Sequence, residues 1–159
     1  MGTGKTQVAK ALAAKLGMKY LSTDKIIEKK EGMKISDIFA EKGEPHFRKA
    51  EKEAVRSASS EEGAVIDAGG GAVIDPENVK NLKKNGVMVC LCADPDLILK
   101  RTSPSAERPL LNTEKPEDAI KRLLSERKEF YARAEHHINT SKLSVEAVVS
   151  EIEKIINNA

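Results

Sequence analysis

Met1-Gly2-Thr3-Gly4-Lys5-Thr6, residues 1–6 of the chain, match the closing half of the phosphate-binding loop pattern G-x-x-x-x-G-K-[ST]. In such a loop, backbone N–H groups and the N-terminus of the following helix surround phosphate oxygens. The Lys5 ammonium would reach the β- and γ-phosphates, and the Thr6 hydroxyl would hold Mg²⁺. The stretch therefore predicts a nucleotide site and a P-loop fold.

The front half of the pattern, an apolar strand ending in the first glycine, does not precede Gly2 in the sequence. We expect either that Met1 is an internal methionine read as a start, or that the first strand is absent from the middle of the sheet. In the second case we expect low stability and a frayed loop around Gly2 and Gly4. An accidental glycine-rich terminus is the competing interpretation, but the helix-compatible run 6–16, which Gly17 ends, favours the loop.

Composition narrows the class of protein. The 159 residues are 40% hydrophobic, which is enough for one globular domain, 1–159, with a core. A net charge of +2 does not indicate a polyanion-binding protein, and 3% aromatic residues without Trp argue against a platform for single-stranded nucleic acid. No apolar run approaches the roughly 20 residues that cross a bilayer, and no signal peptide is readable. We expect a cytoplasmic monomer with no nucleic-acid or membrane partner.

Short apolar runs alternate with longer amphipathic ones along the chain. This alternation predicts an α/β fold in which a parallel sheet is flanked by helices on both faces. Asp75-Pro76 and Asp94-Pro95 each place a capping carboxylate before a proline at the first helical position. The expected strands are 19–21, 64–66, 87–91 and 137–139, and the expected helices are 6–16, 44–59, 76–84, 95–101, 116–135 and 144–156.

The two cysteines, Cys90 and Cys92, lie two residues apart in an apolar run. A strand there would place both side chains on one face. A metal site would need further ligands, and the three histidines have no ligand spacing relative to the cysteines. We expect buried, reduced thiols.

Three groups of residues remain after the loop. Ser22-Thr23-Asp24 follows the second expected strand of the fold, where open α/β sheets bind ligands. Gly43-Glu44-Pro45-His46-Phe47-Arg48 is followed by Glu51 one helical turn later, and Asp67-Ala68-Gly69-Gly70-Gly71 follows another strand. Three consecutive glycines allow close approach of a ligand to the backbone, whereas a simple tight turn needs fewer.

Each of these residues has an ordinary interpretation when taken alone. Asp24 could cap a helix over 25–30, and Arg48 could be a surface arginine paired with Glu51 or Glu44. Together they provide a guanidinium for a carboxylate and an aspartate for a hydroxyl, which is what a kinase for a small polyhydroxylated acid requires.

Taken in order, these motifs resemble the shikimate kinase family over nearly the whole chain. Each motif is weak by itself, and the ordered set is specific. The resemblance implies a fold related to nucleoside monophosphate kinases and transfer of the ATP γ-phosphoryl group to the 3-hydroxyl of shikimate, on the route to chorismate. The residues that carry it are Gly2-x-Gly4-Lys5-Thr6, Ser22-Thr23-Asp24, Ile38-Phe39, Gly43-Glu44, Phe47-Arg48-x-x-Glu51, Gly69-Gly70-Gly71, Arg108-Pro109-Leu110-Leu111, and Arg127 four residues before Tyr131.

The resemblance also implies roles for individual residues. A substrate region, about 24–60, would include Asp24 as the residue that orients or deprotonates the acceptor hydroxyl. A lid, about 102–113, would bring Arg108 onto the phosphates, and the catalytic set would be Lys5, Asp24 and Arg108. ATP and Mg²⁺ would bind through Gly2, Thr3, Gly4, Lys5, Thr6, Gln7, Arg101 and Arg108, with Arg101 stacking on adenine. Shikimate would contact Asp24, Phe39, Phe47, Arg48, Gly69, Gly70, Gly71, Pro109 and Arg127, with Glu51 holding Arg48.

Two residues depart from the family pattern. Glu129 stands where a proline is usual, and Ser22 stands where an aspartate near the metal is common. Asp67, however, ends the apolar run 64–66 as the aspartate of a Walker B segment does. We therefore predict that Thr6 binds Mg²⁺ directly and that Asp67 holds it through water, while a simple cap of the glycine turn is the alternative role for Asp67.

Two rival classes remain open at this stage. Another small-molecule kinase of the same fold, such as a gluconate kinase, would share the P-loop and lid but has no reason to combine Phe47-Arg48-x-x-Glu51 with three glycines. A truncated or non-catalytic protein would keep the ATP- and shikimate-binding residues without closing a proper sheet.

Overall fold

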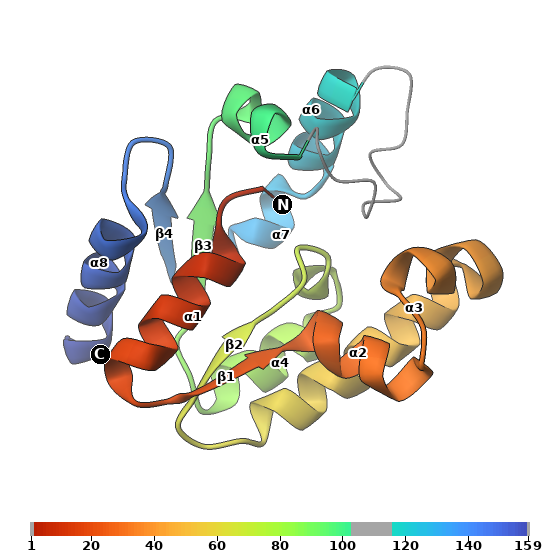
Figure 1. Ribbon diagram of the computed structural model, residues 1–159, viewed down its shortest axis with the longest axis horizontal. Coiled ribbons are helices and arrows are strands. Elements are labelled where there is room, and N and C mark those ends of the chain that lie inside the picture. Colours follow the sequence, from red (N-terminus) through yellow and green to blue (C-terminus); the bar gives the residue numbers. More distant parts are fainter. Residues whose placement is uncertain (1, 103–115, 159) are drawn as a thin grey trace.

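The computed structural model describes residues 2–102 and 116–158, and it arranges them as two pairs of parallel strands with helices around them (Figure 1). Strand β1 (Lys19–Ser22) pairs with β2 (Ala64–Asp67), and β3 (Val89–Cys92) pairs with β4 (His136–Asn139). The strand positions therefore confirm the sequence prediction to within about two residues. Within residues 2–102 and 116–158, the two pairs share no hydrogen bonds.

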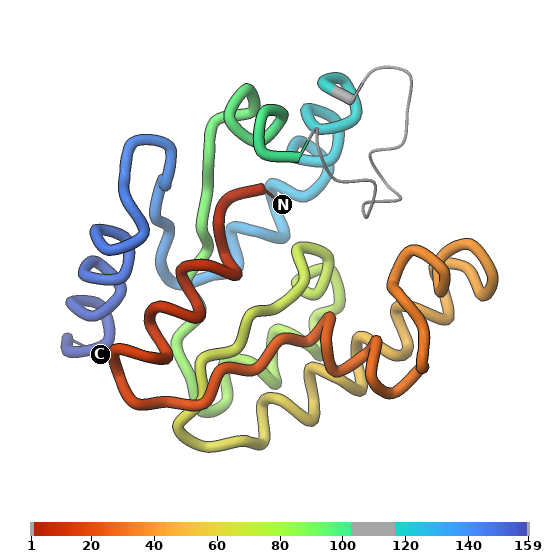
Figure 2. Tube along the Cα trace, viewed as in Figure 1, coloured from red at the N-terminus to blue at the C-terminus, as the bar shows by residue number. Residues whose placement is uncertain are grey.

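Helix α1 (Lys5–Leu16) starts directly after the glycine-rich loop, and Figure 2 shows it running across the middle of the molecule. Gly4 at its N-cap and Gly17 at its C-cap both have left-handed backbone angles, with φ of 88° and 64°. Glycine adopts this conformation at little cost, so both ends of the helix are fixed by sequence. Its apolar side packs against α8 (Val145–Asn157) in one core cluster, whose buried members are Val8, Leu12, Ile138, Val148, Val149 and Ile152.

Helices α2 (Thr23–Glu31) and α3 (Ile35–Ser59) project from the strands and have an apolar cluster of their own. Its buried members are Ile27, Ile38, Phe47, Ala50 and Ala54. The predicted helix 44–59 is present as the second part of α3, but the sequence did not predict its first part. Gly43, with φ 77° and ψ 169°, breaks the helix between the two parts.

The interpretation of Asp24 as a helix cap is wrong. Ser22 is the N-cap of α2, and its hydroxyl accepts a hydrogen bond from the Lys25 N–H at 3.3 Å. Asp24 lies inside the first turn, so its carboxylate is not used to begin the helix. The cap predicted at Asp75 is confirmed, because its carboxylate accepts from the Glu77 N–H at 2.8 Å.

The predicted helix 116–135 is two helices in the structure, α6 (Pro116–Glu126) and α7 (Lys128–Tyr131). Arg127 lies between them with φ −99° and ψ 0°, outside the helical region. The other elements are the 3₁₀ turn η1 (Ala72–Ile74), α4 (Pro76–Lys84) and α5 (Pro95–Thr102), whose Ile98 packs against α6.

Cys90 and Cys92 are half-buried and not fully buried as the sequence predicted, and both are free thiols. Their sulfur atoms lie 3.9 Å apart on one face of β3, and burial with the neighbouring thiol raises the pKa of Cys90 to about 12. Among the residues that the structure describes, no helix is both long and apolar enough to cross a membrane.

Replacing Gly43 with Ala should destabilise the protein by about 1–3 kcal/mol, because the φ and ψ of this residue belong to a region that is open almost only to glycine. Glu41→Ala, an exposed change in the same helix, is the matched control. Urea unfolding measures both free energies. Equal unfolding midpoints for the two variants would show that a side chain at position 43 causes no strain in the backbone.

Candidate active site

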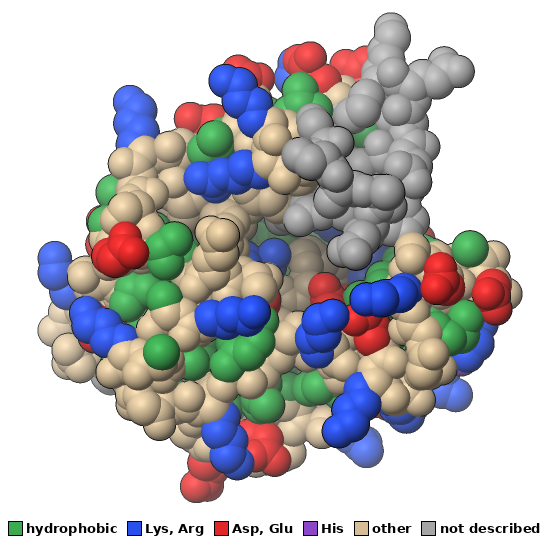
Figure 3. Space-filling model, viewed as in Figure 1, with side chains coloured by type: hydrophobic (Ala, Val, Ile, Leu, Met, Phe, Trp, Pro, Cys, Tyr) green, Lys and Arg blue, Asp and Glu red, His purple; other side chains and the backbone are tan. Residues whose placement is uncertain are grey.

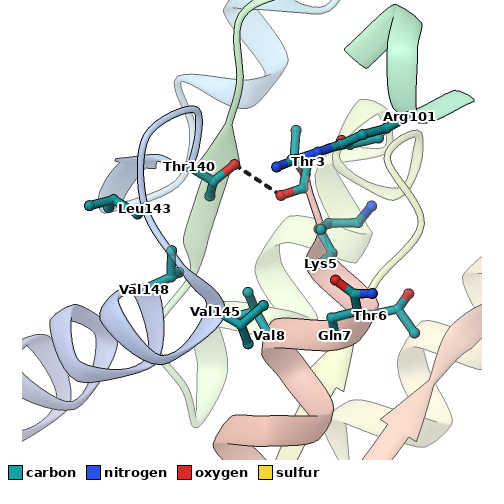
Figure 4. Close-up of a pocket in the computed structure, with 12 residues that line it drawn as sticks. Thr3, Lys5, Thr6, Gln7, Val8, Arg101, Thr140, Leu143, Val145 and Val148 are labelled. Carbon is teal, nitrogen blue, oxygen red and sulfur yellow. Dashed lines mark hydrogen bonds between the residues drawn. The ribbon is translucent and has the colours of Figure 1, made fainter. Parts of the chain in front are cut away.

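The glycine-rich loop borders a cavity of about 450 Å³ (Figure 4). The guanidinium of Arg101, at the end of α5, donates to the Gly2 carbonyl at 3.4 Å. On the other side, the Thr140 hydroxyl donates to the Thr3 carbonyl at 3.0 Å and so ties the end of β4 to the loop. The lining residues are Gly2, Thr3, Gly4, Lys5, Thr6, Gln7, Val8, Arg101, Thr140, Leu143, Val145 and Val148.

This cavity contains every described residue that the sequence predicted for the nucleotide. One wall is polar and includes the N-terminus of α1, which attracts phosphate oxygens. The opposite wall is apolar, from Leu143, Val145 and Val148, and suits the flat face of a base. Sequence reasoning missed this wall and Thr140, since only the docking of α8 brings them to the loop.

Thr6 and Asp67, the two residues predicted for the metal, are joined directly by a hydrogen bond. The Thr6 hydroxyl donates to Asp67 Oδ2 at 2.7 Å, and the Tyr20 hydroxyl donates to the same oxygen at 3.2 Å. Tyr20 was not predicted, although it shares a face of β1 with Ser22 through the two-residue period of a strand. Burial and the Asp67 charge raise the pKa of Tyr20, so its hydroxyl keeps its proton and remains a donor.

Asp24 faces the glycine stretch Gly69–Gly71, which follows β2. A Cβ atom at Gly69 would lie 3.1 Å from Asp24 Oδ1 and 3.1 Å from Glu51 Oε1, so both carboxylates approach the backbone here. Burial raises the pKa of Asp24, the Lys5 charge partly offsets this, and the Asp67 charge adds to it. A buried carboxylate with a raised pKa, on which a lysine charge also acts, is suited to general-base work.

Arg48 is held by two carboxylates on α3. Its Nη1 donates to Glu51 Oε2 at 2.7 Å, and its Nη2 donates to Glu44 at 2.8 Å. Glu51 is only 2% exposed, and burial raises its pKa although Arg48 opposes the rise. A Cβ at Gly71 would lie 2.3 Å from Arg48 Nη1. Glycine at this position therefore gives the guanidinium room to lie against the loop.

Arg127 is 9% exposed, and its charge adds a small lowering effect on the pKa of Glu51, which burial raises overall. Phe47 packs in the core of α2 and α3, and its ring centroid lies 4.6 Å from that of Phe39. Arg48 lies over the Phe47 ring at 5.3 Å. The predicted residues Arg108 and Pro109, and the predicted lid apart from Thr102, lie outside the described residues.

Thr23 is a site residue that sequence reasoning left without a role. It is fully buried, and its hydroxyl accepts from the Gly69 N–H at 3.1 Å and contacts the Asp67 carbonyl at 3.5 Å. A threonine between Ser22 and Asp24 was a weak signal, because threonine is equally common on exposed strand ends.

One face of the molecule is hollowed. Figure 3 shows the hollow between the part of the molecule that carries α5 and the part that carries α2 and α3, with Lys and Arg side chains at its border. The buried Asp24, on which the Lys5 charge acts, approaches Gly69, and the Arg48 guanidinium lies against Gly71. The arrangement suits transfer of a phosphoryl group to a hydroxyl of a small anionic molecule.

Comparisons with known proteins agree with this chemistry. The family model described as shikimate kinase matches residues 1–157. A shikimate kinase of Caldanaerobacter subterraneus is 45% identical over 152 residues, covering 96% of this chain and 89% of that protein. A shikimate kinase of Geobacter metallireducens is 48% identical over 152 residues, covering 96% of this chain and 85% of that protein.

Solved structures are similar as well. The structure of shikimate kinase from Acinetobacter baumannii in complex with shikimate has a TM-score of 0.95 and 35% identity, covering 99% of this chain and 89% of that one. The shikimate kinase of Aquifex aeolicus has a TM-score of 0.82 and 32% identity, covering 99% of this chain and 92% of that one. These similarities confirm the predicted P-loop fold.

Replacing Arg48 with Met should lower the free energy of unfolding by about 2 kcal/mol at neutral pH, because it leaves the Glu51 carboxylate buried without its partner. Without Arg48 the pKa of Glu51 rises further. Since a carboxyl group with a raised pKa binds its proton more tightly in the folded state, stability falls as the pH rises through that pKa. The loss should therefore be larger at pH 8 than at pH 5.

Urea unfolding at the two pH values measures this difference. The double variant Arg48→Met with Glu51→Gln is the control, since the neutral amide removes the unpaired charge and should recover most of the loss. A loss that does not depend on pH would contradict the assignment of the effect to the Glu51 charge.

Proposed function

This chain belongs to the shikimate kinase family, and from that premise we propose that it transfers the γ-phosphoryl group of ATP to the 3-hydroxyl of shikimate. It is a phosphotransferase with an alcohol group as acceptor, on the route to chorismate and the aromatic amino acids. The observation that carries the proposal is the approach of the Asp24 carboxylate and the Arg48 guanidinium to the glycine stretch, with the Lys5 charge acting on Asp24. The Arg127 charge acts on Glu51, the partner of Arg48. A cytoplasmic monomer is part of the proposal.

The substrate would lie with its carboxylate against Arg48 and Arg127 and its ring over Gly69–Gly71. Arg48 is already oriented by Glu51 and Glu44, so little side-chain freedom would be lost when a planar carboxylate binds its fork. Phe39 and Phe47 would provide apolar contact for the ring, together with Pro109. This arrangement would direct a ring hydroxyl toward Asp24.

Asp24 would accept or orient the proton of the attacking hydroxyl. Its carboxylate approaches the glycine stretch and the Lys5 charge acts on it, so the acceptor oxygen and the phosphate would meet there. Phosphoryl transfer needs mostly positioning and charge neutralisation, because the transition state spreads negative charge over phosphate oxygens. Lys5 would supply part of that charge, and Arg108, which lies outside the described residues, would supply the rest.

ATP would occupy the cavity beside the loop. Its phosphates would lie at the N-terminus of α1, over Gly2, Gly4 and Gln7, and its base would lie between Arg101 and the apolar wall of the cavity. The Arg101 guanidinium is planar and can stack on an aromatic ring. Its contact with the Gly2 carbonyl already places it at the mouth of the cavity.

Mg²⁺ would be held by Thr6 and Asp67. The Thr6 hydroxyl would bind the ion directly, and Asp67, 2.7 Å from that hydroxyl, would hold it through one of the several waters that Mg²⁺ keeps. The bound ion would neutralise phosphate charge. Ser22, which stands where an aspartate is common in the family, instead caps α2 with its hydroxyl. The carboxylate for the metal has in this proposal moved from the end of β1 to the end of β2.

Substrate identity is tested by ADP release from ATP and Mg²⁺ with shikimate, gluconate or nucleoside monophosphates. Turnover should occur with shikimate and not with the others. Arg48→Lys should lower kcat/KM for shikimate by about tenfold or more, because lysine keeps the charge but loses the bidentate fork. Equal or greater turnover with gluconate would refute the proposal.

The metal site is tested by Asp67→Asn, which should raise the Mg²⁺ concentration for half-maximal activity by about tenfold, as losses of outer metal partners do. Adding Ser22→Asp should restore part of the affinity, since it returns a carboxylate to the end of β1. Titrating activity with Mg²⁺ at saturating ATP and shikimate measures the shift. An unchanged Mg²⁺ dependence in Asp67→Asn would show that Asp67 does not hold the metal and only caps the glycine turn.

A further inference from the structure

Arg133 joins two segments that are far apart in the sequence. Its Nη1 donates to the Val73 carbonyl at 2.9 Å and to the Ile74 carbonyl at 3.3 Å. Its guanidinium also lies 4.8 Å from the centre of the Phe130 ring, on the preceding turn. One half-buried side chain thus fastens the end of the α7 segment to η1.

The η1 turn continues directly from the glycine stretch. The Ala72 N–H donates to the Gly69 carbonyl at 3.0 Å, and the Ile74 N–H donates to the Gly71 carbonyl at 3.1 Å. These two hydrogen bonds make the glycines and η1 one folded unit. A group that holds the carbonyls of Val73 and Ile74 therefore also holds Gly69–Gly71.

On the other side of the contact between Arg133 and η1, backbone hydrogen bonds connect Arg133 to Arg127. The Tyr131 N–H donates to the Arg127 carbonyl at 2.9 Å, and the Arg133 N–H donates to the Phe130 carbonyl at 3.2 Å. Backbone hydrogen bonds therefore link Arg127 to Arg133 over two consecutive turns. Arg127 itself begins α7, so its position follows that of the short helix.

Besides Arg133, helix α7 is tied by the Arg127 N–H, which donates to the Leu123 carbonyl at 3.1 Å, and by His137 Nε2, 3.1 Å from the Tyr131 carbonyl. Helix α7 itself buries little. It is four residues long, and none of its residues is buried. Apolar burial, which normally anchors a helix, is therefore small here. Two hydrogen bonds from a charged donor are strong by comparison.

We propose that Arg133 is a positioning residue for Arg48 and Arg127, the two arginines that would bind the substrate carboxylate. It sets the place of Arg127 relative to the glycine stretch and Arg48. This inference rests on the proposed function for the identity of the bound carboxylate. Arg48 lies on α3 and Arg127 at the N-cap of α7. Arg48 donates a hydrogen bond to Glu51, and the positive charges of both arginines favour the ionised form of Glu51. Because bidentate recognition depends on geometry, a shift of α7 weakens the grip on the substrate carboxylate while the nucleotide cavity on the other side of the loop is unaffected.

The test compares Arg133→Met with Arg133→Lys and with Lys128→Met, an exposed charge removed from the same short helix. Met keeps an unbranched apolar stem against Phe130 but cannot donate to the carbonyls. Arg133→Met should raise KM for shikimate by about five- to tenfold, with KM for ATP changed less than about twofold. Arg133→Lys, which still donates, should recover part of the loss, and Lys128→Met should resemble the wild type.

Hydrogen exchange of the Ala72 and Ile74 amides gives a readout that does not depend on turnover. Arg133→Met should speed their exchange about tenfold without changing that of the α1 amides. If the wild type does not phosphorylate shikimate, the proposed function fails while this measurement still decides whether Arg133 fastens η1. Unchanged exchange, or faster exchange with an unchanged KM for shikimate, would overturn the positioning role. An equal rise in both KM values would overturn it too, as a general loss of structure.

Discussion

The packing of α1 against both strand pairs is the contact on which the rest of the site depends. The pairs share no hydrogen bonds within the described ranges, yet Val65 of β2 and Val89 of β3 pack against the same cluster as Val8 and Leu12 of the helix. Apolar burial stabilises this arrangement but has no direction, so it does not by itself set the position of the loop. Polar contacts at the N-terminus of α1 do so: Thr6 bonds to Asp67 on one side, and Thr140 bonds to the Thr3 carbonyl on the other.

Buried charge dominates the opposite side of the site. Asp24 and Glu51 both have pKa values raised by burial, and the nearby charges of Lys5 and Arg48 offset part of this cost. Such groups are poor sources of stability, because removing two charges from water costs about as much as their attraction returns. Their value lies in orientation that exists before a ligand arrives. Glycine at position 71 contributes to this orientation, because any Cβ there would displace the Arg48 guanidinium.

Local signals in the sequence predicted much of this structure, and tertiary contacts account for what they missed. Asp75-Pro76 marks a helix start by chemistry within two residues, and it was placed correctly. The first half of α3 was missed because Gly43 and a nearby proline look like a boundary, whereas Gly43 only kinks the chain. The break at Arg127 had no such marker, since no glycine or proline stands there. The contacts of Tyr20 with Asp67 and of Arg133 with η1 join residues 47 and about 60 positions apart, beyond the reach of any periodicity.

The hydrogen bonds of Thr23 explain how acceptor and phosphate can be aligned although α2 and α3 have a separate core. Thr23 is fully buried, it accepts from the Gly69 N–H, and its hydroxyl lies against the Asp67 carbonyl. Asp24 is the next residue, so the proposed base, the glycine floor and the proposed metal carboxylate are fixed to one another at the end of the β1–β2 pair. The apolar cluster of α2 and α3 is separate from these contacts, and Arg48 lies on α3. In-line transfer depends on the distances among Asp24, the glycine floor and Asp67 far more than on the position of Arg48. Only those distances place the attacking oxygen against the phosphorus. The contacts of Thr23 therefore fix those distances at the end of the β1–β2 pair, where the proposed chemistry needs them.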